Sequence, residues 1–366
     1  MANPKIKDVV SFLEAWAPPS LQESYDNAGL LVGDREKNVT GILVALDCTE
    51  AVVEEARRTG CNLIVAHHPI IFKGLKRLTG ANHVERTVIS AIRNEIALFA
   101  AHTNLDNVFT GVNQKIASVI GLKETHILIP RKDTLSKLVT FIPHSHAGQV
   151  MDALFKAGAG QIGNYKNCSF RLDGQGTYLP SEGSHPFKGE PGKMETVDET
   201  RAEVIFPRHL TSAIMNALRA THPYEEVAHY LTELSNEDQE SGTGMIGLLP
   251  EPLEPFEFLR RLKASMALNV IRHTAPAGQI HKVAVCGGSG SSFLRAAILA
   301  GADAYVSADF KYHEFFEAEG KILIADVGHF ESEQFTKDLL VEVLSKKFPT
   351  FAINFSKTVT NPISYL

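Results

Sequence analysis

The chain has 366 residues, of which 44% are hydrophobic and 21% charged, and its formal net charge is −6. These values predict two or three globular domains and exclude extensive disorder, and the acidic balance gives no reason to expect a nucleic-acid partner. The four cysteines form no CxxC pair, so neither a zinc ribbon nor a disulfide framework is indicated. We find no signal segment and no apolar run of membrane-spanning length, and we therefore expect a cytoplasmic protein without a membrane partner.

The first part of the chain alternates helices with buried strands. Its clearest strand, Leu63-Ile64-Val65-Ala66, is a continuous apolar run of the kind found in parallel strands covered on both faces. Strand, helix and strand in succession form a βαβ unit, so we expect parallel neighbours. We interpret the stretch 25–33, with its Asp, Asn and Gly, as a turn rather than a functional loop. The expected helices are 5–17, 50–59, 82–94 and 112–120, and the other expected strands are 42–47 and 96–101.

The pattern changes near residue 127 and then follows the order βαββαβ, which is typical of the ferredoxin-like split unit. A stretch rich in Gly, Pro and Ser, 173–193, is expected to be a hairpin loop, and the acidic linker 235–242 looks like a domain boundary. The expected strands lie near 138–143, 168–172, 201–206 and 227–231, and the expected helices near 146–157 and 208–219.

After the linker the chain returns to alternating strands and helices. The expected strands are 244–249, 282–286, 304–307 and 322–327, and the expected helices are 255–267, 292–299 and a long final helix that opens at Glu333. Because such units lie on both sides of the middle section, we predict an α/β fold with an insertion. The prediction is a three-layer α/β domain formed from both chain ends, 1–128 and 241–366, with an inserted ferredoxin-like α+β domain at 129–240.

Three of the expected strands end in side chains that bind metals. Open α/β sheets place their ligands beyond the carboxyl ends of the strands, and imidazole is the commonest side-chain metal ligand. Six nitrogen and oxygen donors exceed what one tetrahedral zinc takes from a protein, whereas two metals bridged by carboxylates would use them all. The residues are His67 and His68, His102 and Asp106, and His329 and Glu333.

The spacing of these residues sets conditions on such a centre. Neighbouring strand residues point to opposite faces, so His67 and His68 can serve one centre only if the backbone turns, which Pro69 favours. His329 and Glu333 are four residues apart and can share one helix face. With no thiolate in the set, zinc, iron, manganese and nickel all fit. Each residue also has a structural explanation when it is taken alone. A histidine at a strand end can be an ordinary hydrogen-bonded polar residue, Asp106 can cap a turn, and Glu333 at a helix N-terminus is favoured by the helix dipole.

Two further motifs have both a functional and a structural interpretation. The glycine-rich stretch 287–290 can bind an anion through backbone N–H groups, but it lacks the P-loop ending, and we favour a tight turn. Asp309 and His313 can form a proton-transfer pair or support the ligands, and His313 is our candidate catalytic residue. The stretch 222–227 can bind a ligand at a subunit interface or form a turn.

Five motifs carry a resemblance to one family: Tyr-Asp-Asn-Ala-Gly-Leu at 25–30, Ala-His-His-Pro at 66–69, His-Thr-Asn-Leu-Asp at 102–106, Ser-Ala-Asp-Phe-Lys-Tyr-His-Glu at 307–314 and Asp-Val-Gly-His-Phe-Glu-Ser-Glu at 326–333. Together they resemble the NGG-interacting-factor-like family, catalogued as GTP cyclohydrolase 1 type 2 homologue, in its long bacterial form. The resemblance implies a ring-like homohexamer whose dinuclear metal sites face an internal cavity. It assigns the metals to His67, His68, Asp106, His329 and Glu333, with His102 as a further participant.

The middle section resembles the PII/CutA-like insert of the longer bacterial members, through His222-Pro223-Tyr224-Glu225-Glu226 and the order of its strands. The catalogue name implies opening of the GTP ring, but no residue here indicates guanine recognition. We therefore expect a hydrolase that uses two divalent metal ions on a small-molecule substrate. The alternative is a regulatory or metal-handling oligomeric scaffold whose PII-like insert binds a ligand or partner. Nucleic-acid binding is the weakest alternative, given the acidic balance.

Overall fold

The computed structural model describes residues 4–275 and 278–366. The chain divides into two compact units. Unit 1 comprises Met1–Pro130 with Glu240–Leu366, and unit 2 comprises Arg131–Gln239. Within the described residues, no helix is long and apolar enough to cross a membrane.

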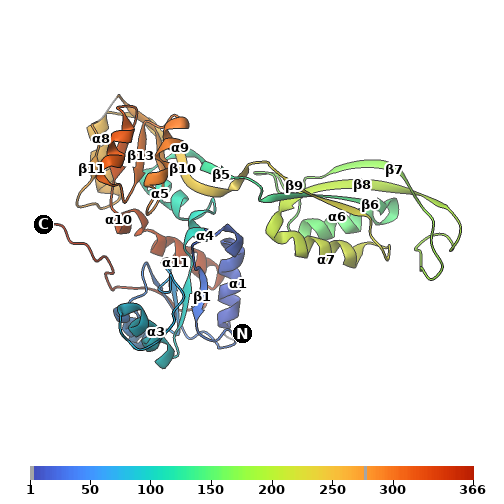
Figure 1. Ribbon diagram of the computed structural model, residues 1–366, viewed down its shortest axis with the longest axis horizontal. Coiled ribbons are helices and arrows are strands. Elements are labelled where there is room, and N and C mark those ends of the chain that lie inside the picture. The colour runs from blue at the N-terminus through green and yellow to red at the C-terminus, as the bar shows by residue number, and fades with distance from the viewer. Residues whose placement is uncertain (1–3, 276–277) are drawn as a thin grey trace. The chain divides into compact units, whose positions relative to one another are not determined.

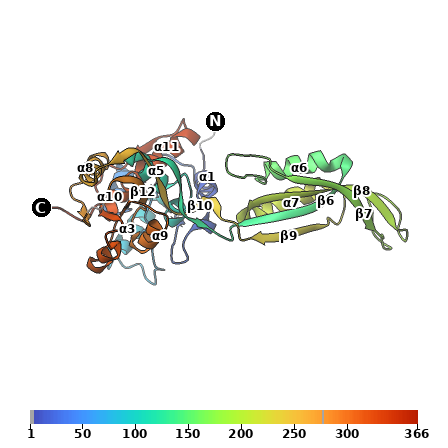
Figure 2. The same ribbon diagram turned by 90° about the horizontal axis from the view of Figure 1, so that it is seen from above.

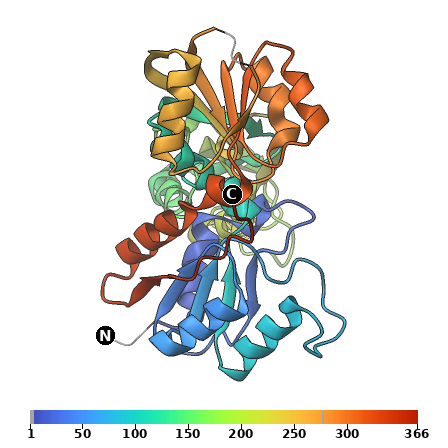
Figure 3. The same ribbon diagram turned by 90° about the vertical axis from the view of Figure 1, so that its left-hand side faces the viewer.

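The first sheet of unit 1 has five strands in the order β1-β4-β3-β2-β15 (Figure 3). β15, β2, β3 and β4 run parallel, and β1 pairs antiparallel with β4. The register aligns Ala45, Ala66 and Ala100, so the three central strands end at one level. The strands are β1 Gly29–Val32, β2 Ile42–Ala45, β3 Leu63–Ala66, β4 Ala97–Ala100 and β15 Ile353–Phe355.

Both faces of this sheet are covered, which explains its continuous apolar strands. Val65 of β3 belongs to the core that contains the buried side of α1 Ile6–Trp16. Ile64, its neighbour, belongs to the core on the opposite face, with α2 Glu50–Thr59 and α3 His83–Arg93. α2 begins and ends as its sequence predicts, because the Thr49 hydroxyl accepts a hydrogen bond from the Val52 N–H and Gly60 closes it with φ +71°.

The second sheet of unit 1 has six strands in the order β11-β14-β13-β12-β10-β5. β12, β13 and β14 run parallel, and the register aligns Val285, Val306 and Ala325 near their carboxyl ends. α5 Val112–Ile120 and α8 Pro255–Ser265 pack in one core, and α9 Leu294–Leu299 packs in another. The strands are β5 Lys123–Arg131, β10 Asp238–Leu253, β11 Arg272–His273, β12 Ile280–Val285, β13 Ala304–Ser307 and β14 Leu323–Asp326.

The two sheets correct the expectation of one three-layer domain. β15, from the C-terminal part of the chain, joins the first sheet, and β5, from the N-terminal part, joins the second. Apolar periodicity predicts where a strand is but not which strand it pairs with, so this exchange was not visible in the sequence. The prediction that Glu333 opens the long final helix is also wrong. Glu333 ends the short α10 His329–Glu333, and the long helix is α11 Thr336–Lys347.

The remaining elements of unit 1 are short. α4 Thr103–Asp106 is one helical turn directly after β4, where the sequence indicated only a polar loop. In Figure 1, α4 and α10 lie in the region between the strands of the two sheets. The 3-10 helices of this unit are η1 Pro19–Leu21, η4 Ser291–Phe293 and η5 Tyr312–Ala318.

Unit 2 follows the predicted order βαββαβ and forms an antiparallel sheet with the strand order β7-β8-β6-β9 (Figure 2). α6 and α7 pack in one core with Leu138 and Val204, so both helices cover the same face of the sheet. The elements are β6 Leu135–Pro143, η2 His144–His146, α6 Ala147–Lys156, β7 Phe170–Tyr178, β8 Glu195–Pro207, η3 Arg208–Leu210, α7 Thr211–Thr221 and β9 His229–Leu234.

Two boundaries in this region differ from the sequence expectation. The stretch 173–193 is not entirely a loop, because β7 continues to Tyr178 and β8 begins at Glu195. The second half of the linker 235–242 is strand, because β10 begins at Asp238. β7 is largely exposed and tolerates its two glycines and its aspartate, although these residues are normally depleted in strands.

A buried carboxylate fixes the path of the C-terminal segment. Glu55 of α2 accepts hydrogen bonds from the Ser356 hydroxyl and from the N–H groups of Lys357 and Thr358. Burial opposes ionisation of Glu55, but these hydrogen bonds outweigh it and hold its pKa below the ordinary value of 4.5.

We predict that Glu55→Ala destabilises the protein by about 2–4 kcal/mol, because it leaves the buried Ser356 hydroxyl and two partly buried backbone donors without their carboxylate partner. The depressed pKa means that this contribution is present above the ordinary carboxyl pKa and is lost as the pH falls through the folded value. Chemical denaturation at pH 7 and at pH 3 should therefore give a difference between wild type and variant that shrinks at low pH. Glu54→Ala, which removes an exposed ion pair with Arg57, is the control and should change stability little. Equal stabilities of wild type and Glu55→Ala at pH 7 would contradict this account.

Candidate metal centre

Two adjacent histidines follow β3 at the point where the backbone bends. The His68 N–H donates to the Leu46 carbonyl at 2.9 Å, and the His67 N–H also approaches this carbonyl, at 3.1 Å. Both residues therefore leave the extended strand geometry that would point them to opposite faces. Their ring centroids lie 4.8 Å apart, so the turn expected before Pro69 is confirmed.

Four imidazoles in this region share one hydrogen-bonding arrangement. In each ring Nδ1 lies 2.7–2.8 Å from a carbonyl or carboxylate oxygen. Such oxygens only accept, so Nδ1 carries a proton in every ring, and Nε2 is the nitrogen that can bind a metal once it has no proton, as in metal-binding histidines. The pairs are His67 with the Ala101 carbonyl, His68 with Asp47, His102 with Asp26, and His329 with Asp309.

Three of the Nε2 atoms converge on the buried carboxylate of Glu333. His68 Nε2 lies 3.0 Å and His329 Nε2 lies 3.2 Å from Oε2 of Glu333. His67 Nε2 lies 3.6 Å from the other oxygen, Oε1, and also 3.6 Å from Oδ1 of Asp106. One ligand atom each from His67, His68 and Glu333 lies within 4.8 Å of the others, which is close enough for these three to share a metal ion.

Two buried atoms of this group indicate that it accommodates a cation. His67 Nε2 and Asp106 Oδ1 have no hydrogen-bond partner, although they face each other. An unsatisfied buried polar atom costs about 1–3 kcal/mol. Their 3.6 Å separation is too long for a hydrogen bond, but it suits two atoms that each lie about 2 Å from one metal ion. The donor set therefore fits a divalent metal.

Without metal, protons on the imidazoles offset the negative charge of the buried Glu333 carboxylate. Burial opposes ionisation of Glu333, but hydrogen bonds from the surrounding imidazoles hold its pKa well below its ordinary value. Burial also opposes protonation of His68, but Asp47 and Glu333 outweigh it and raise its pKa to about 10. Hydrogen bonding to Glu333 raises the pKa of His329 to about 9. Protons thus balance the carboxylates at neutral pH, and a bound cation would displace them.

The glycine-rich stretch 287–290 lies against Glu333. The Gly287 N–H donates to Asn113 Oδ1 and the Gly288 N–H donates to Ser332 Oγ, so these donors are not available to an anion. Gly288 has φ +61°, and a Cβ there would overlap Oε1 of Glu333. The preferred interpretation as a turn is therefore confirmed, and the turn also makes room for the carboxylate.

The structure shows which of His102, Asp309 and His313 lie at the cluster of ligands. His102 belongs to the cluster, because its ring centroid lies 5.4 Å from that of His67 and 5.5 Å from that of His68. Asp309 holds the ring of His329. His313 is exposed, its ring contacts Tyr312 and Phe316, and it is not among the residues that line the cavity described below.

Three supporting residues were missed in the sequence. Asp26, interpreted as part of a turn, accepts hydrogen bonds from His102 and Thr103, which overcome burial and lower its pKa to about 2. Asp47 accepts the Nδ1–H of His68 and the hydroxyl hydrogen of Thr360. The place of Asp47 at a strand end was a usable signal, because β2 pairs with β3. Thr360 lies outside any periodic element and gave no signal.

A cavity of about 800 Å³ opens beside these ligands, within the size range of small-molecule sites. His68, His102, Asp106, His329 and Glu333 line it, together with apolar side chains that include Tyr25, Phe72 and Ile363. None of its described lining residues is a lysine or an arginine. The centre is thus accessible to a small molecule, but the walls offer no side-chain cation.

Comparison with known proteins gives one family over almost the whole chain. The family described as Duf34/NIF3 (NGG1p interacting factor 3) matches residues 4–362. Two relatives named "GTP cyclohydrolase 1 type 2 homolog" are similar over 98% of both chains, with 38% identity for the protein of Halalkalibacterium halodurans and 36% for that of Bacillus subtilis. The crystal structure of a Bacillus cereus protein related to NIF3 covers 100% of both chains at 36% identity, with a TM-score of 0.89.

We predict that Gly288→Ala weakens binding of Zn²⁺ about tenfold or more, because the new methyl group displaces Glu333. Gly301→Ala is the matched control, since Gly301 has φ +71° and a Cβ there meets nothing within 4 Å. Both variants should lose about 1 kcal/mol of stability through the left-handed backbone, but only Gly288→Ala should lose affinity. Competition with a chromophoric chelator measures the affinity. Equal affinities in the two variants would contradict the role of Glu333 as a metal ligand.

We further predict that Thr360→Val weakens Zn²⁺ binding by about three- to tenfold, because Asp47 loses the hydroxyl that fixes it behind His68. Thr360→Ser keeps the hydroxyl and should retain wild-type affinity. The same chelator competition applies, with thermal unfolding as a check that both variants fold. Wild-type affinity in Thr360→Val would show that the C-terminal segment does not support His68.

Proposed function

Because the chain belongs to the Duf34/NIF3 family, we propose that it is a metal-dependent hydrolase of a small molecule with a dinuclear centre. Two divalent ions, drawn from zinc, iron, manganese and nickel, would be held by His67, His68, Asp106, His329 and Glu333. His102 would be a further ligand. Its Nδ1 is held by Asp26, so Nε2 would be the nitrogen that binds the metal.

One observation carries this proposal: the two oxygens of Glu333 face different imidazoles. Oε1 faces His67 on the side of Asp106, and Oε2 faces His68 and His329. A carboxylate placed in this way can bridge two metal ions. The unpaired buried atoms of His67 and Asp106 support one of the two positions, and the approach of His68 Nε2 and His329 Nε2 to the same oxygen of Glu333 supports the other.

The residues of the chain would divide the work of hydrolysis. Bound metal ions would supply a water of lowered pKa and would polarise the bond that is cleaved. Asp26, Asp47 and Asp309 hold the imidazoles in the tautomer and direction that bind a metal. Tyr25 and Phe72, with ring centroids 6.3 Å apart, give the substrate an apolar surface at the cavity.

The charge of the cavity restricts the substrate. No lysine or arginine is present among its described lining residues, so the metals would be the main positive charges available to a phosphate. A triphosphate carries more negative charge than such a site balances easily. The name of the relatives therefore does not lead us to propose GTP, and we favour a substrate with a single ester, amide or ring carbon to be attacked.

The assembly and the inserted unit belong to the same proposal. We propose a cytoplasmic homohexamer, as the family resemblance implies, and sedimentation equilibrium of the purified chain tests its mass. We also propose that unit 2 is a ferredoxin-like, PII/CutA-like insert. Its order βαββαβ and its antiparallel strand order β7-β8-β6-β9 support this assignment.

A regulatory or metal-handling scaffold is the second candidate function. A cavity of about 540 Å³ lined only by residues of unit 2 favours it, because this cavity is separate from the metal ligands. Deletion of residues 131–239 distinguishes the two functions. A hydrolase core would keep its metal and some turnover, whereas a scaffold would lose its ligand response or its assembly.

We predict that the double variant His67→Ala/His68→Ala loses metal and turnover together. With two of the ligands gone, bound metal per chain, measured by mass spectrometry of protein purified without chelators, should fall by half or more. Turnover of the best substrate in a panel of phosphoesters, amides and nucleotides should fall by about a hundredfold or more. His126→Ala, an exposed residue of β5, is the control and should match wild type. Turnover that persists after complete removal of metal would refute the hydrolase proposal.

A further inference from the structure

One face of the unit 2 sheet is not covered by its two helices. Ala202 and Val204 of β8 pack with α6 and α7, so Arg201 and Glu203, which alternate with them along the strand, point to the opposite face. The strand register places Leu172, Arg201 and Phe141 in one row across this open face. Glu199 is two residues before Arg201 on β8 and lies on the same face. It is the diagonal neighbour of Phe141, and the two side chains are close enough to contact each other.

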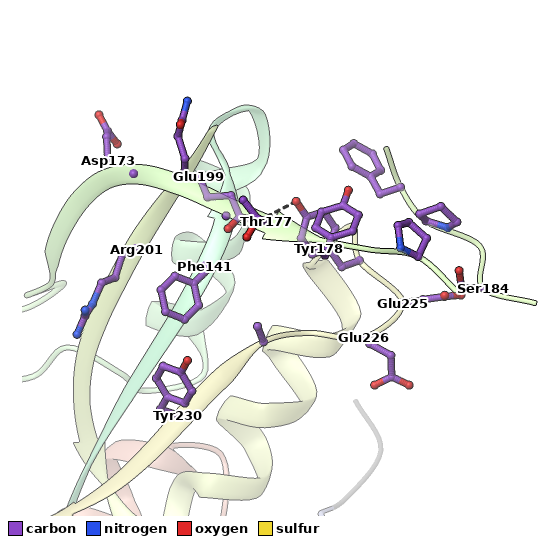
Figure 4. Close-up of a pocket in the computed structure, with 18 of the residues that line it drawn as sticks. Phe141, Asp173, Thr177, Tyr178, Ser184, Glu199, Arg201, Glu225, Glu226 and Tyr230 are labelled. Carbon is purple, nitrogen blue, oxygen red and sulfur yellow. Dashed lines mark hydrogen bonds between the residues drawn. The ribbon is translucent and has the colours of Figure 1, made fainter. Parts of the chain in front are cut away.

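Two loops turn part of this face into a cavity (Figure 4). The loop between β7 and β8 contributes Pro180, Ser184 and Phe187, and the segment before β9 contributes Tyr224 to Glu226. The enclosed volume of about 540 Å³ falls within the range of small-molecule sites. All of these residues belong to unit 2.

The motif His222-Pro223-Tyr224-Glu225-Glu226 builds one wall of this cavity. The Tyr224 N–H donates to His222 Nδ1, so Nε2 of the same ring carries the proton and donates to the Phe141 carbonyl at 2.9 Å. Burial lowers the pKa of His222, which keeps the ring in this neutral form. The ring thus ties the loop to β6, and the motif has a structural role beside any ligand.

Tyr224 in turn holds a buried carboxylate at the cavity. Its hydroxyl donates to Oε1 of Glu199 at 2.7 Å, and Glu199 is only 7% exposed. Gly176 of β7 lies against the same carboxylate, since a Cβ there would overlap Oε2 of Glu199. The glycine in the middle of β7 therefore has a steric reason, namely to leave room for this side chain.

Aromatic rings surround the carboxylate on two sides. Phe141 and Tyr230 make an edge-to-face contact with centroids 5.6 Å apart. Tyr224 contacts Tyr178 at 5.9 Å and Phe187 at 6.1 Å. Figure 4 shows Phe141 and Tyr230 below Glu199, with Tyr178 beside it. Ring faces carry partial negative charge and attract cations.

The charges at the cavity are predominantly negative. Asp173, Glu199, Glu225 and Glu226 line it, whereas Arg201 is the one lysine or arginine among the described lining residues. The guanidinium of Arg201 is already engaged, because it lies 2.8 Å from Glu203. An anionic ligand would therefore meet uncompensated repulsion, and a cation would find both a carboxylate and aromatic faces.

We propose that this cavity binds an organic cation, an amine or quaternary ammonium group attached to an aromatic or apolar body. The charged group pairs with Glu199 and packs against the rings, and the body lies on the row formed by Leu172 and Phe141. A buried carboxylate is needed here because a desolvated cation without a counter-charge is costly. The proposal gives the second candidate function a ligand chemistry, and its test does not depend on the metal centre.

The test compares three probes that share one aromatic body and differ in charge. Tyramine is cationic, tyrosol is neutral and 4-hydroxyphenylacetate is anionic at pH 7. Isothermal titration with the full-length protein should give affinities in this order, with tyramine about tenfold or more tighter than tyrosol and no measurable binding of the anion. Equal affinities for the three probes, or tightest binding of the anion, would overturn the proposal.

Two variants locate the site, and a third controls for the loss of charge. Glu199→Gln keeps an acceptor for Tyr224 and should weaken tyramine about tenfold while leaving tyrosol unchanged. Phe141→Leu keeps an apolar contact and should weaken tyramine about two- to fivefold through loss of the ring face. Glu233→Gln removes an exposed carboxylate of the same sheet outside the cavity and should bind tyramine like wild type. Thermal unfolding confirms that each variant folds.

Two other outcomes would also overturn the proposal. If tyramine affinity in Glu199→Gln and in Glu233→Gln equals that of wild type, the cation binds elsewhere. If amide signals of the cavity residues change with protein concentration in the absence of any probe, and tyramine does not reverse the change, the open face is an interface between copies of the chain.

Discussion

The burial of the Glu333 carboxylate is the constraint on which the rest of unit 1 depends. A carboxylate with 3% of its residue exposed is tolerated only if several donors face it. Here His68 and His329 supply two of them in the absence of metal, and each ring is fixed from behind by an aspartate. Removing any one of these partners leaves a buried charge that the others cannot balance, so the group behaves as one unit.

The two sheets are arranged so that their strand ends meet at this carboxylate. β3 delivers His67 and His68, β4 delivers His102, and the segment after β14 delivers His329 and Glu333. Gly288, which follows β12, leaves the space that Glu333 occupies. The chain then returns through β15 and passes Glu55, which brings Thr360 to Asp47. The centre thus draws on both sheets and on the C-terminal segment.

Local chemistry made much of this centre predictable. Buried strands show up as apolar runs, and polar residues directly after them mark the edge where ligands bind, which identified His67, His68 and Asp106. The prediction that His329 and Glu333 share one helix face is confirmed although the helix was wrongly identified, because one helical turn is enough to bring residues four apart together. Asp26 was misjudged because aspartate favours turns and also accepts from histidine, and only the fold decides between these roles.

The features that the sequence did not reveal depend on pairing between distant segments. The two-sheet arrangement, the support from Thr360 and the continuation of β7 past residue 173 all follow from a neighbour far along the chain. Gly174 and Gly176 indicated a loop by composition, yet both lie in a strand that pairs with β8, and Gly176 leaves the space that the Glu199 side chain occupies. Glycine signals close approach as well as flexibility, and the two cannot be separated without the partner.

The two cavities are both acidic, but they compensate their charge by different chemistry. A metal ion needs nitrogen or oxygen atoms within a few ångströms of one another, and among the described residues His67, His68 and Glu333 meet that condition. The acids of unit 2 are spread around aromatic rings, and no three of its described donors form such a group. Dispersed carboxylates beside ring faces favour a large, weakly hydrated cation over a small divalent one. Under the two proposals, one chain would hold metal ions at one site and bind an organic cation at the other without the two ligands competing.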